Sequence, residues 1–268
     1  MNPILDVRRE VDFLRGHHPN AANISLEELD ARIHELARPY DPLIVFDTSE
    51  VRAEQAAADL KSRGRDDTTI VYGEEWLHTG RVVSGPATVR LWRPHDLLVD
   101  AIQFAQPIAS GSAKPRALDL ACGAGRDAVY LAMQGFDVDA FDILPDALDR
   151  CRDLARRNGV TVNTDVRDVE NAPNLGDGVY DLICVFNFLY RPLMPSIVAA
   201  TRPGGLVIYE TFLAGQRERF GKPKSDDKIL KLNELPTYFE RWETLIYREG
   251  FTNPRRLAAS LIARKPLG

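Results

Sequence analysis

The sequence has few cysteines and histidines, and this scarcity argues against a metal site or a disulfide-bonded fold. Only three cysteines and five histidines occur among the 268 residues, and neither set shows the spacing of metal ligands. The cysteines, Cys122, Cys151 and Cys184, are odd in number, and we interpret them as buried thiols in a reducing compartment. We therefore expect a cytoplasmic protein with no bound metal.

Long apolar runs and basic clusters are also missing. No stretch approaches the ~20 apolar residues of a membrane span, and the first residues, MNPILDVRRE, lack the apolar core of a signal peptide. The formal net charge is -5, which disfavours nucleic acid as a partner. With 44% hydrophobic and 27% charged residues, the composition is typical of one large or two modest globular domains.

Strand and helix patterns alternate over residues 1–82. Ser25 and Glu28 have the spacing of a capping box at the start of one helix, and Gly64 marks the end of another. The alternation predicts an α/β fold with a small parallel sheet. The expected strands are 4–7, 42–46 and 68–73, and the expected helices are 25–37 and 50–64.

The second of these strands ends in Asp47, at the head of a loop that leads into a helix. Such a loop usually holds an anion with its amides and the helix dipole, yet here the position is itself acidic. Glu50 adds a second negative charge, and Arg52 ends the loop. Either Asp47 replaces a bound anion and pairs with Arg52, or it only caps the helix. No supporting Lys or second acidic pair accompanies it, which disfavours aspartyl-phosphate chemistry.

The order of short motifs over residues 1–82 resembles the rhodanese family. The family has a loop that begins with a sulfur-accepting Cys and ends with Arg. Here Asp47 replaces that Cys, and Glu50 replaces a usual Gly. Because sulfur transfer needs a thiolate, the resemblance implies a rhodanese-like domain that is inactive as a sulfurtransferase. The matching motifs are Asp6-Val7-Arg8, Gly16 to Ala21, Asp47 to Arg52, and Gly73 to Trp76.

A change of composition separates this segment from the rest of the chain. Gly80, Gly85 and Pro86 indicate a linker, which we place at residues 83–92. The pattern HDLLVDAIQFA that follows predicts an amphipathic helix, which would cover the cofactor cleft of a second domain over residues 93–268.

The segment RALDLACGAGRDAVYLAMQG predicts a strand, a glycine turn and a helix. Gly123 and Gly125 would let a ligand approach the backbone closely. The letters GAGRDA fit a dinucleotide fingerprint as well as an S-adenosylmethionine loop, so the turn alone leaves both open. Asp119, before the glycines, would repel a pyrophosphate but could accept the α-ammonium of a methionine moiety. This favours S-adenosylmethionine.

Acidic residues end the next two predicted strands. Asp142 could accept both hydroxyls of a ribose, in either class of cofactor. Asp168 and Val169 follow the third strand and could meet an adenine amine and ring. A fourth strand, a helix, an Arg-Pro-Gly-Gly turn and a fifth strand follow over residues 179–212.

This set of motifs resembles the class I S-adenosylmethionine-dependent methyltransferases over residues 88–268. The resemblance implies a Rossmann-like, seven-stranded sheet with helices on both faces, in which the strands at 243–251 and 255–266 pair antiparallel. Within the class, CGAGRDAVYLA is most similar to the tellurite-resistance branch. That branch methylates small, soft nucleophiles such as thiols and chalcogen oxyanions.

The resemblance also assigns cofactor contacts, each with a structural alternative. Asp165 competes with Asp168 for the adenine, Asn187 could only cap the next helix, and Arg126 could form a surface salt bridge. The implied contacts are Asp119, Gly123, Gly125 and Arg126 at the methionine end, Asp142 and Ile143 at the ribose, Asp168 and Val169 at the adenine, and Asn187 beneath the sulfonium.

Substrate candidates follow the fourth and fifth strands, at the sheet edge where such folds bind ligands. They are Tyr190, Arg191, Tyr209 and Glu210. Arg191 could attract an anionic substrate, and Tyr209 could shape an aromatic wall, although both aromatic residues could equally be packing. No catalytic base is identifiable.

We therefore predict a small-molecule methyltransferase with an inactive rhodanese-like module. One alternative is an S-adenosylmethionine-binding regulatory or interaction protein without turnover. A dinucleotide oxidoreductase is a third hypothesis, which the charge of Asp119 disfavours.

Overall fold

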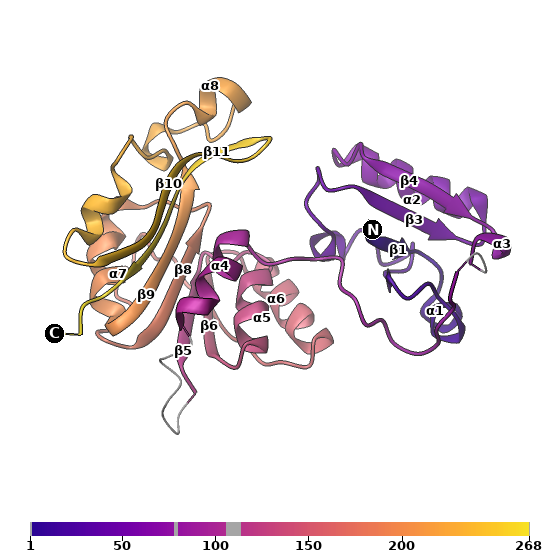
Figure 1. Ribbon diagram of the computed structural model, residues 1–268, viewed down its shortest axis with the longest axis horizontal. Coiled ribbons are helices and arrows are strands. Elements are labelled where there is room, and N and C mark those ends of the chain that lie inside the picture. The colour runs from indigo at the N-terminus through magenta and orange to yellow at the C-terminus, as the bar shows by residue number, and fades with distance from the viewer. Residues whose placement is uncertain (1, 78–79, 106–113, 268) are drawn as a thin grey trace. The chain divides into compact units, whose positions relative to one another are not determined.

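The computed structural model describes residues 2–77, 80–105 and 114–267. The chain divides into two compact units, Met1–Arg93 and Pro94–Gly268, each with its own β-sheet (Figure 1). Residues 83–92, expected as a linker, belong to the first unit. Val83 pairs with His17 there, and Leu91 is buried in its core.

The first unit contains a four-stranded parallel sheet, which confirms the expected architecture. Three strands coincide with the predicted ones. The fourth, β2, has only three residues, too few to give a periodic pattern in the sequence. In the order β2-β1-β3-β4, the strands are Ala21–Asn23, Ile4–Asp6, Leu43–Asp47 and Thr68–Tyr72.

Alternate residues of this sheet face two separate apolar clusters, as the two-residue period of a strand requires. On one face, Leu5 and Val45 pack with Leu60 of α2 (Glu50–Ser62). On the other face, Phe46 packs with residues of α1 (Glu10–Arg15) and α3 (Glu74–Leu77). The sheet is therefore covered by helical segments on both faces.

The helix expected at 25–37 is wrong. This segment consists of turns and one short 3-10 helix, η1 (Ile33–Glu35). Its main-chain bonds mostly reach the third preceding residue, as from Glu28 to Ser25 and from Leu36 to Ile33. The apolar residues still reach the core, since Leu29 and Leu36 are buried. The apolar pattern predicted correctly which residues are buried, but the backbone places them there with turns that are tighter than an α-helix.

The second unit has the expected seven-stranded sheet, and its strand order is β10-β11-β9-β8-β5-β6-β7. All neighbouring strands are parallel except at β11, which runs antiparallel to both β9 and β10. The Pro-Gly-Gly segment lies within β9, at an irregularity of its pairing with β8. The strands are β5 Arg116–Leu120, β6 Asp137–Asp142, β7 Asn163–Val166, β8 Tyr180–Phe186, β9 Thr201–Phe212, β10 Glu243–Asn253 and β11 Arg256–Arg264.

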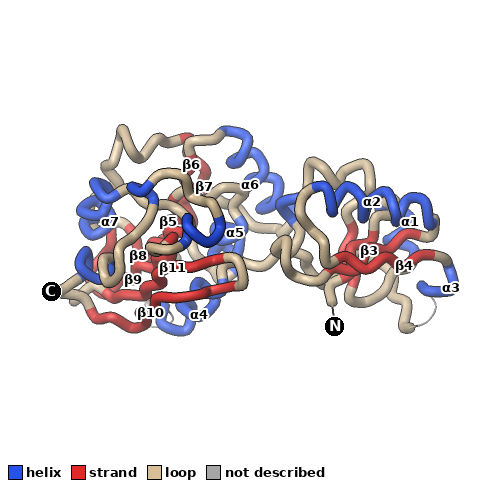
Figure 2. The backbone as a smooth tube through the Cα atoms, turned by 90° about the horizontal axis from the view of Figure 1, so that it is seen from above, coloured by secondary structure: helices blue, strands red, loops and turns tan. Residues whose placement is uncertain are grey.

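Helices cover both faces of this sheet, with α4, α5 and α6 on one side and α7 on the other (Figures 1 and 2). The amphipathic helix before the glycine turn is present as α4, with Leu97, Leu98, Ala101 and Ala105 buried. The helical elements are α4 Asp96–Ala105, α5 Arg126–Met133, α6 Pro145–Arg157, η3 Arg191–Leu193, α7 Met194–Ala200, α8 Gln216–Phe220, η4 Asp226–Lys228 and η5 Leu235–Phe239.

The five parallel strands of the second unit end at one edge of the sheet. Loops after parallel strands meet at that edge and form the usual ligand site of such folds. All the predicted cofactor residues lie in or beside these loops, apart from Asp119, which is still within β5. In the described part of the chain, no helix is long and apolar enough to cross a membrane.

Candidate functional site

Asp142 ends β6, and its carboxylate accepts two backbone hydrogen bonds. Oδ2 accepts the N–H of Gly123 at 2.8 Å, and Oδ1 accepts the N–H of Leu144 at 3.0 Å. Gly123 belongs to the turn after β5, so Asp142 ties two neighbouring loops together. Among the residues that the structure describes, no Lys or Arg side chain pairs with it, and the half-buried carboxylate keeps acceptor capacity for a ligand.

Asp168 and Val169 follow β7 and form the next loop at the same edge. The Asp168 carboxylate closes its own turn by accepting the N–H of Glu170 at 3.0 Å and the side-chain amide of Asn171 at 2.6 Å. The competitor Asp165 instead pairs with Arg167 at 2.7 Å. Of the two acidic residues, only Asp168 lines the cavity beside Asp142.

That cavity has a volume of about 390 Å³ and brings four predicted cofactor residues together. Asp142, Ile143, Asp168 and Val169 all line it, together with the predicted substrate residue Tyr190. Its volume lies in the range of small-molecule sites. Ile143, at 56% exposure, offers an apolar surface next to the acidic groups.

The two glycines of the turn are required for different reasons. Both have left-handed backbones, with φ of 55° at Gly123 and 75° at Gly125. A Cβ on Gly123 would meet no atom within 4 Å, whereas one on Gly125 would overlap the Cys151 thiol on α6. Gly125 is therefore explained by helix packing, while Gly123 leaves its backbone open to a ligand. Arg126 begins α5 and is half-buried.

Asp119 lies beneath the glycine turn, with only 2% of its surface exposed. Its Oδ2 accepts the N–H of Ala128 in α5 at 2.9 Å, and its Oδ1 lies 3.6 Å from the Cys184 thiol. Burial, and next to it the charge of Asp127, raise the pKa of Asp119 well above its usual range. This carboxyl group anchors the helix that follows the turn. The negative charge of Asp119 is therefore a weaker argument against a dinucleotide than the sequence suggested.

Asn187 directly follows β8 and has a left-handed backbone with φ of 60°. Its N–H donates to the Glu210 carbonyl at 3.0 Å, and its side chain is exposed. Ala121, at the end of the adjacent β5, is left-handed as well, with φ of 57°. Left-handed residues other than glycine are uncommon and concentrate at functional sites. Two of them stand here, each directly after one of two neighbouring strands.

Two substrate candidates lie where they cannot act as expected. Arg191 donates to both carboxylate oxygens of Glu234, at 2.6 and 3.0 Å, and to the main-chain carbonyls of Asp227 and Ile229. This cation is already neutralised and holds a loop. Tyr209 is 1% exposed and donates its hydroxyl to the Phe188 carbonyl at 3.0 Å, so it belongs to the core.

A cation near the cavity comes instead from Lys228, which no sequence motif indicated. Its Nζ lies 5.8 Å from the ring centroids of both Phe188 and Tyr190, and both rings line the cavity. It pairs with Glu170, a further lining residue, at 2.7 Å. Both members of this pair are substantially exposed, and such pairs are weak enough to open.

Glu210 is 1% exposed and lies at the centre of a polar cluster. Its Oε1 lies 3.2 Å from His95 Nε2 and 3.3 Å from Arg256 Nε, and its Oε2 accepts the Ser260 hydroxyl at 2.6 Å. Burial alone would raise the pKa of Glu210, but these partners hold it down at about 2. His95 was missed because it reads as the start of the apolar pattern of α4.

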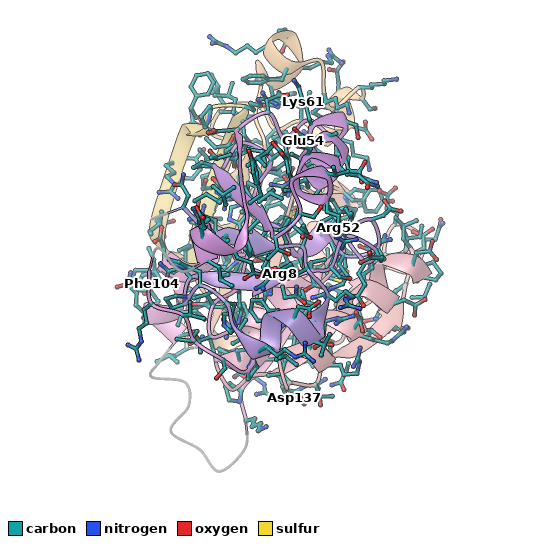
Figure 3. The ribbon with its side chains drawn as sticks, turned by 90° about the vertical axis from the view of Figure 1, so that its right-hand side faces the viewer. Arg8, Arg52, Glu54, Lys61, Phe104 and Asp137 are labelled. Carbon is teal, nitrogen blue, oxygen red and sulfur yellow. The ribbon has the colours of Figure 1, made fainter. Side chains whose placement is uncertain are left out.

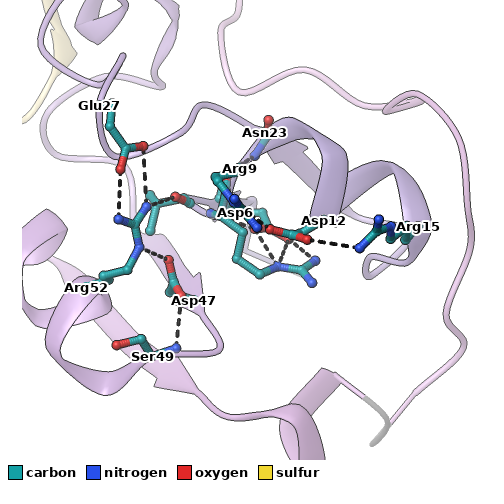
Figure 4. Close-up of polar contacts among 11 residues, drawn as sticks. Asp6, Arg9, Asp12, Arg15, Asn23, Glu27, Asp47, Ser49 and Arg52 are labelled. Carbon is teal, nitrogen blue, oxygen red and sulfur yellow. Dashed lines mark hydrogen bonds and ion pairs between the residues drawn. The ribbon is translucent and has the colours of Figure 1, made fainter.

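In the first unit, too, an acidic residue ends a parallel strand, but here its side chain pairs with an arginine (Figure 4). Asp47 Oδ1 accepts the N–H of Ser49 at 2.9 Å, and its Oδ2 accepts Arg52 Nε at 3.0 Å. Arg52 also pairs with Glu27 at 2.8 Å, and these acids raise the pKa of Arg52. The second loop acid, Glu50, accepts a hydrogen bond from Tyr72 and raises the pKa of that phenol.

Asp47 thus has both oxygens occupied and is 2% exposed. It is not the cap of α2, because the N-cap position is held by Ser49 and Asp47 accepts the N–H of that residue and pairs with Arg52 instead. This unit has a second pair of an acidic residue with an arginine, Asp6 with Arg8 at 2.6 Å, and both of its members are buried. The two arginines, Arg8 and Arg52, are labelled in Figure 3. Among the described residues, no three His, Cys, Asp or Glu side chains are grouped to hold a metal ion.

Comparison with protein families gives a match for each unit. The model of tellurite resistance protein TehB matches residues 91–259, and the model of the rhodanese-like domain matches residues 1–77. These matches confirm both resemblances seen in the sequence.

Individual relatives match the second unit. Hemagglutinin 1 of Eikenella corrodens is 33% identical over 163 residues, which are 58% of this chain and 51% of the relative. The probable S-adenosyl-L-methionine-dependent methyltransferase TehB of Haemophilus influenzae (strain ATCC 51907 / DSM 11121 / KW20 / Rd) is 29% identical over 58% of this chain and 53% of its own length. The chain thus spans about half the length of these curated relatives.

Solved structures share the fold of the second unit. The crystal structure of TehB from Haemophilus influenzae has a TM-score of 0.52 and 24% identity, covering 64% of this chain and 62% of that one. The N-methyltransferase NodS from Bradyrhizobium japonicum WM9, in complex with S-adenosyl-L-homocysteine, has a TM-score of 0.50 and 17% identity. It covers 64% of this chain and 86% of that one.

Proposed function

The chain belongs to the family of tellurite resistance protein TehB, and a rhodanese-like domain precedes the matching region. We therefore propose that the second unit transfers a methyl group from S-adenosylmethionine to a small molecule. The acceptor class that we propose is a thiol or a chalcogen oxyanion. The observation that supports this most is the cavity in which Asp142, Ile143, Asp168 and Val169 meet.

The residues at the sheet edge fit the proposed cofactor in size and charge. Asp142 would accept the ribose hydroxyls beside Ile143, and Asp168 with Val169 would meet the adenine. Gly123 has open space where a side chain would stand, so the methionine end can approach the backbone there. Arg126 and Asn187 would flank that end. Gly125 and Asp119 would act indirectly, by shaping the turn.

The bound cofactor would supply an electrophilic methyl group on a sulfonium. The protein would mainly position the acceptor in line with it and exclude water, because a thiolate or oxyanion needs little help from a base. Tyr190 and Phe188 line the cavity and would border the acceptor. Lys228, beside both rings, takes over the role of attracting an anion that the sequence suggested for Arg191.

We also propose that the rhodanese-like domain does not transfer sulfur. Asp47 occupies the position of the nucleophile, and a carboxylate cannot form a persulfide. Its pairing with Arg52 supports a loop that is internally neutralised. We therefore expect the purified protein to have no thiosulfate:cyanide sulfurtransferase activity.

The proposal is tested first by mass spectrometry of the purified protein, since S-adenosylmethionine, a dinucleotide and no ligand are distinct results. Methyl-labelled cofactor is then incubated with small thiols, selenite and tellurite, and separately with bulk RNA and protein. We expect label in the small molecules. Label confined to the macromolecules would contradict the acceptor class, and a co-purified dinucleotide would contradict the reaction.

A further inference from the structure

His95 has no role among the cofactor contacts proposed above, yet it is held at four points. Its main-chain N–H donates to Asp127 Oδ1 at 2.6 Å. Its ring stacks on Phe186 with 4.0 Å between centroids and planes 4° apart. Nε2 lies 3.2 Å from Glu210 Oε1, and Nδ1 accepts the N–H of Leu97 at 3.3 Å. The side chain is 13% exposed.

The hydrogen bonds assign different roles to the two ring nitrogens. Because Nδ1 of His95 accepts a main-chain N–H, the proton of the neutral ring is on Nε2, which lies 3.2 Å from Glu210 Oε1. Glu210 is ionised, since its pKa is held at about 2 by His95 and Arg256 despite burial. Neither ring nitrogen is left to take a proton from a substrate. The geometry is that of a fixed ring and not of a general base.

The partners of His95 lie in strands and a helix that adjoin two separate turns. Phe186 is followed by Asn187, whose N–H donates to the main-chain carbonyl of Glu210 at 3.0 Å. Glu210 therefore holds Asn187 through its backbone and His95 through its carboxylate. Asp127 lies in the first turn of α5, directly after the glycine turn. Through these partners, His95 connects the end of β8 with the start of α5.

We propose that His95 is a positioning residue for methyl transfer, which fixes the glycine turn and the Asn187 turn at the separation that the methionine end of the cofactor requires. The inference depends on the proposed function, because these two turns flank the methionine end only if S-adenosylmethionine binds there. In-line transfer is sensitive to placement, and a displacement of ~1 Å can cost about a hundredfold in rate. A rigid, buried link between the turns meets that requirement.

Two ligands separate this role from a general structural one. S-adenosylhomocysteine occupies the whole cofactor site, whereas 5′-methylthioadenosine has the same adenosine and sulfur without the amino-acid end. In His95→Phe the ring can still stack on Phe186, but the contact of Nε2 with the Glu210 carboxylate is lost. Calorimetry should show S-adenosylhomocysteine affinity falling by at least about tenfold, with 5′-methylthioadenosine affinity unchanged. His95→Gln, which restores a donor, should recover part of the loss.

A folded His95→Phe protein that keeps the wild-type ratio of the two affinities would overturn the inference. An equal loss for both ligands would do so too, because it indicates general destabilisation. If the wild type binds neither ligand, the proposed function fails and this inference fails with it. If the wild type binds both ligands and the variant keeps the same ratio of affinities, the proposed function stands and only the role of His95 is contradicted.

Hydrogen exchange on the wild-type protein tests the inference even if the variant does not fold. S-adenosylhomocysteine should slow exchange at the first turn of α4, residues 97–99, together with the glycine and Asn187 turns. 5′-Methylthioadenosine should protect only the loops around Asp142 and Asp168. Equal protection of α4 by both ligands, or by neither, would overturn the proposed link.

Discussion

Asp47 in the first unit and Asp142 in the second both end a parallel strand and begin with the same local geometry. One oxygen of each accepts the main-chain N–H two residues later, at 2.9 Å for Asp47 and 3.0 Å for Asp142. The other oxygen differs. For Asp47 it accepts Arg52 Nε at 3.0 Å, whereas for Asp142 it accepts the N–H of Gly123 at 2.8 Å.

This difference decides what each carboxylate is able to do. Arg52 provides a full positive charge, so Asp47 is neutralised within its own loop while 2% exposed. Gly123 offers only a dipole, and Asp142 remains half-buried at the wall of a cavity. An acidic residue after a strand is therefore not in itself a sign of a ligand site. The partner of its second oxygen indicates whether its charge is already compensated.

The largest effect that we expect comes from Asp142→Ala. Loss of two charge-assisted contacts to ribose hydroxyls should lower S-adenosylhomocysteine affinity by roughly 3 kcal/mol, about a hundredfold. Calorimetry measures this, and Asp47→Ala is the matched control that should leave the affinity unchanged. If Asp142→Ala binds as tightly as the wild type, the two carboxylates do not differ in the way proposed.

Glu210 extends the comparison to a third carboxylate, which is buried and has a cationic partner in Arg256. Its pKa is lowered from 4.5 to about 2 in the folded protein, so its contribution to stability is present above pH 4.5 and is lost as the pH falls towards 2. The contribution is roughly 3 kcal/mol. Urea unfolding at several pH values should show a shallower acid-side decline for Glu210→Gln than for the wild type. Parallel curves would show that the pKa of Glu210 is the same in the folded and the unfolded protein.

Arg52→Gln tests whether Asp47 depends on its own cation. The variant leaves a carboxylate with 3% side-chain exposure without its charge partner, although Arg52 itself is 33% exposed. After allowance for solvent screening, we expect a loss of roughly 1–2 kcal/mol in the stability of the first unit. Arg63→Gln, which breaks the exposed pair with Asp30, should cost less than about 0.5 kcal/mol. Equal effects would mean that Asp47 needs no cation.

The smallest expected effect is a gain of sulfur chemistry in the first unit. Asp47→Cys alone should gain little, because Glu50 raises the pKa of a nearby thiol and repels thiosulfate. Asp47→Cys combined with Glu50→Gly should form a persulfide that requires Arg52, detectable by mass spectrometry after thiosulfate treatment. A folded double variant that takes up no sulfur would show that this loop no longer cradles an anion.

The sequence predicted most of the architecture because burial and strand ends leave clear patterns. It identified both units, the order of the second sheet's elements and the loops around Asp142 and Asp168. It failed at the 25–37 helix, where apolar spacing fits tight turns equally well. It also assigned Gly125 to the cofactor, and the structure adds a packing reason that the sequence could not show, since a Cβ there would overlap the Cys151 thiol on α6.

The site contacts that the sequence did not predict depend on side chains from distant segments. In the sequence Arg191 was a candidate for attracting an anion, but its charge is neutralised by Glu234, which lies 43 positions later. Lys228 and His95 have no motif around them, and each gains its place only when the sheet is assembled. Short-range patterns therefore predict where the loops lie, while long-range packing decides which charges remain for a ligand.

The order of strands in the second sheet also limits how the chain can fold during synthesis. β11 lies between β9 and β10 and pairs with both, although it is the last strand along the chain. β10 therefore has no place in the sheet until residues 256–264 have left the ribosome. All strands of the first unit precede Arg93 and can pair much earlier. While the ribosome completes the last strand, the unpaired edge of β9 would be exposed to chaperones and to other nascent chains.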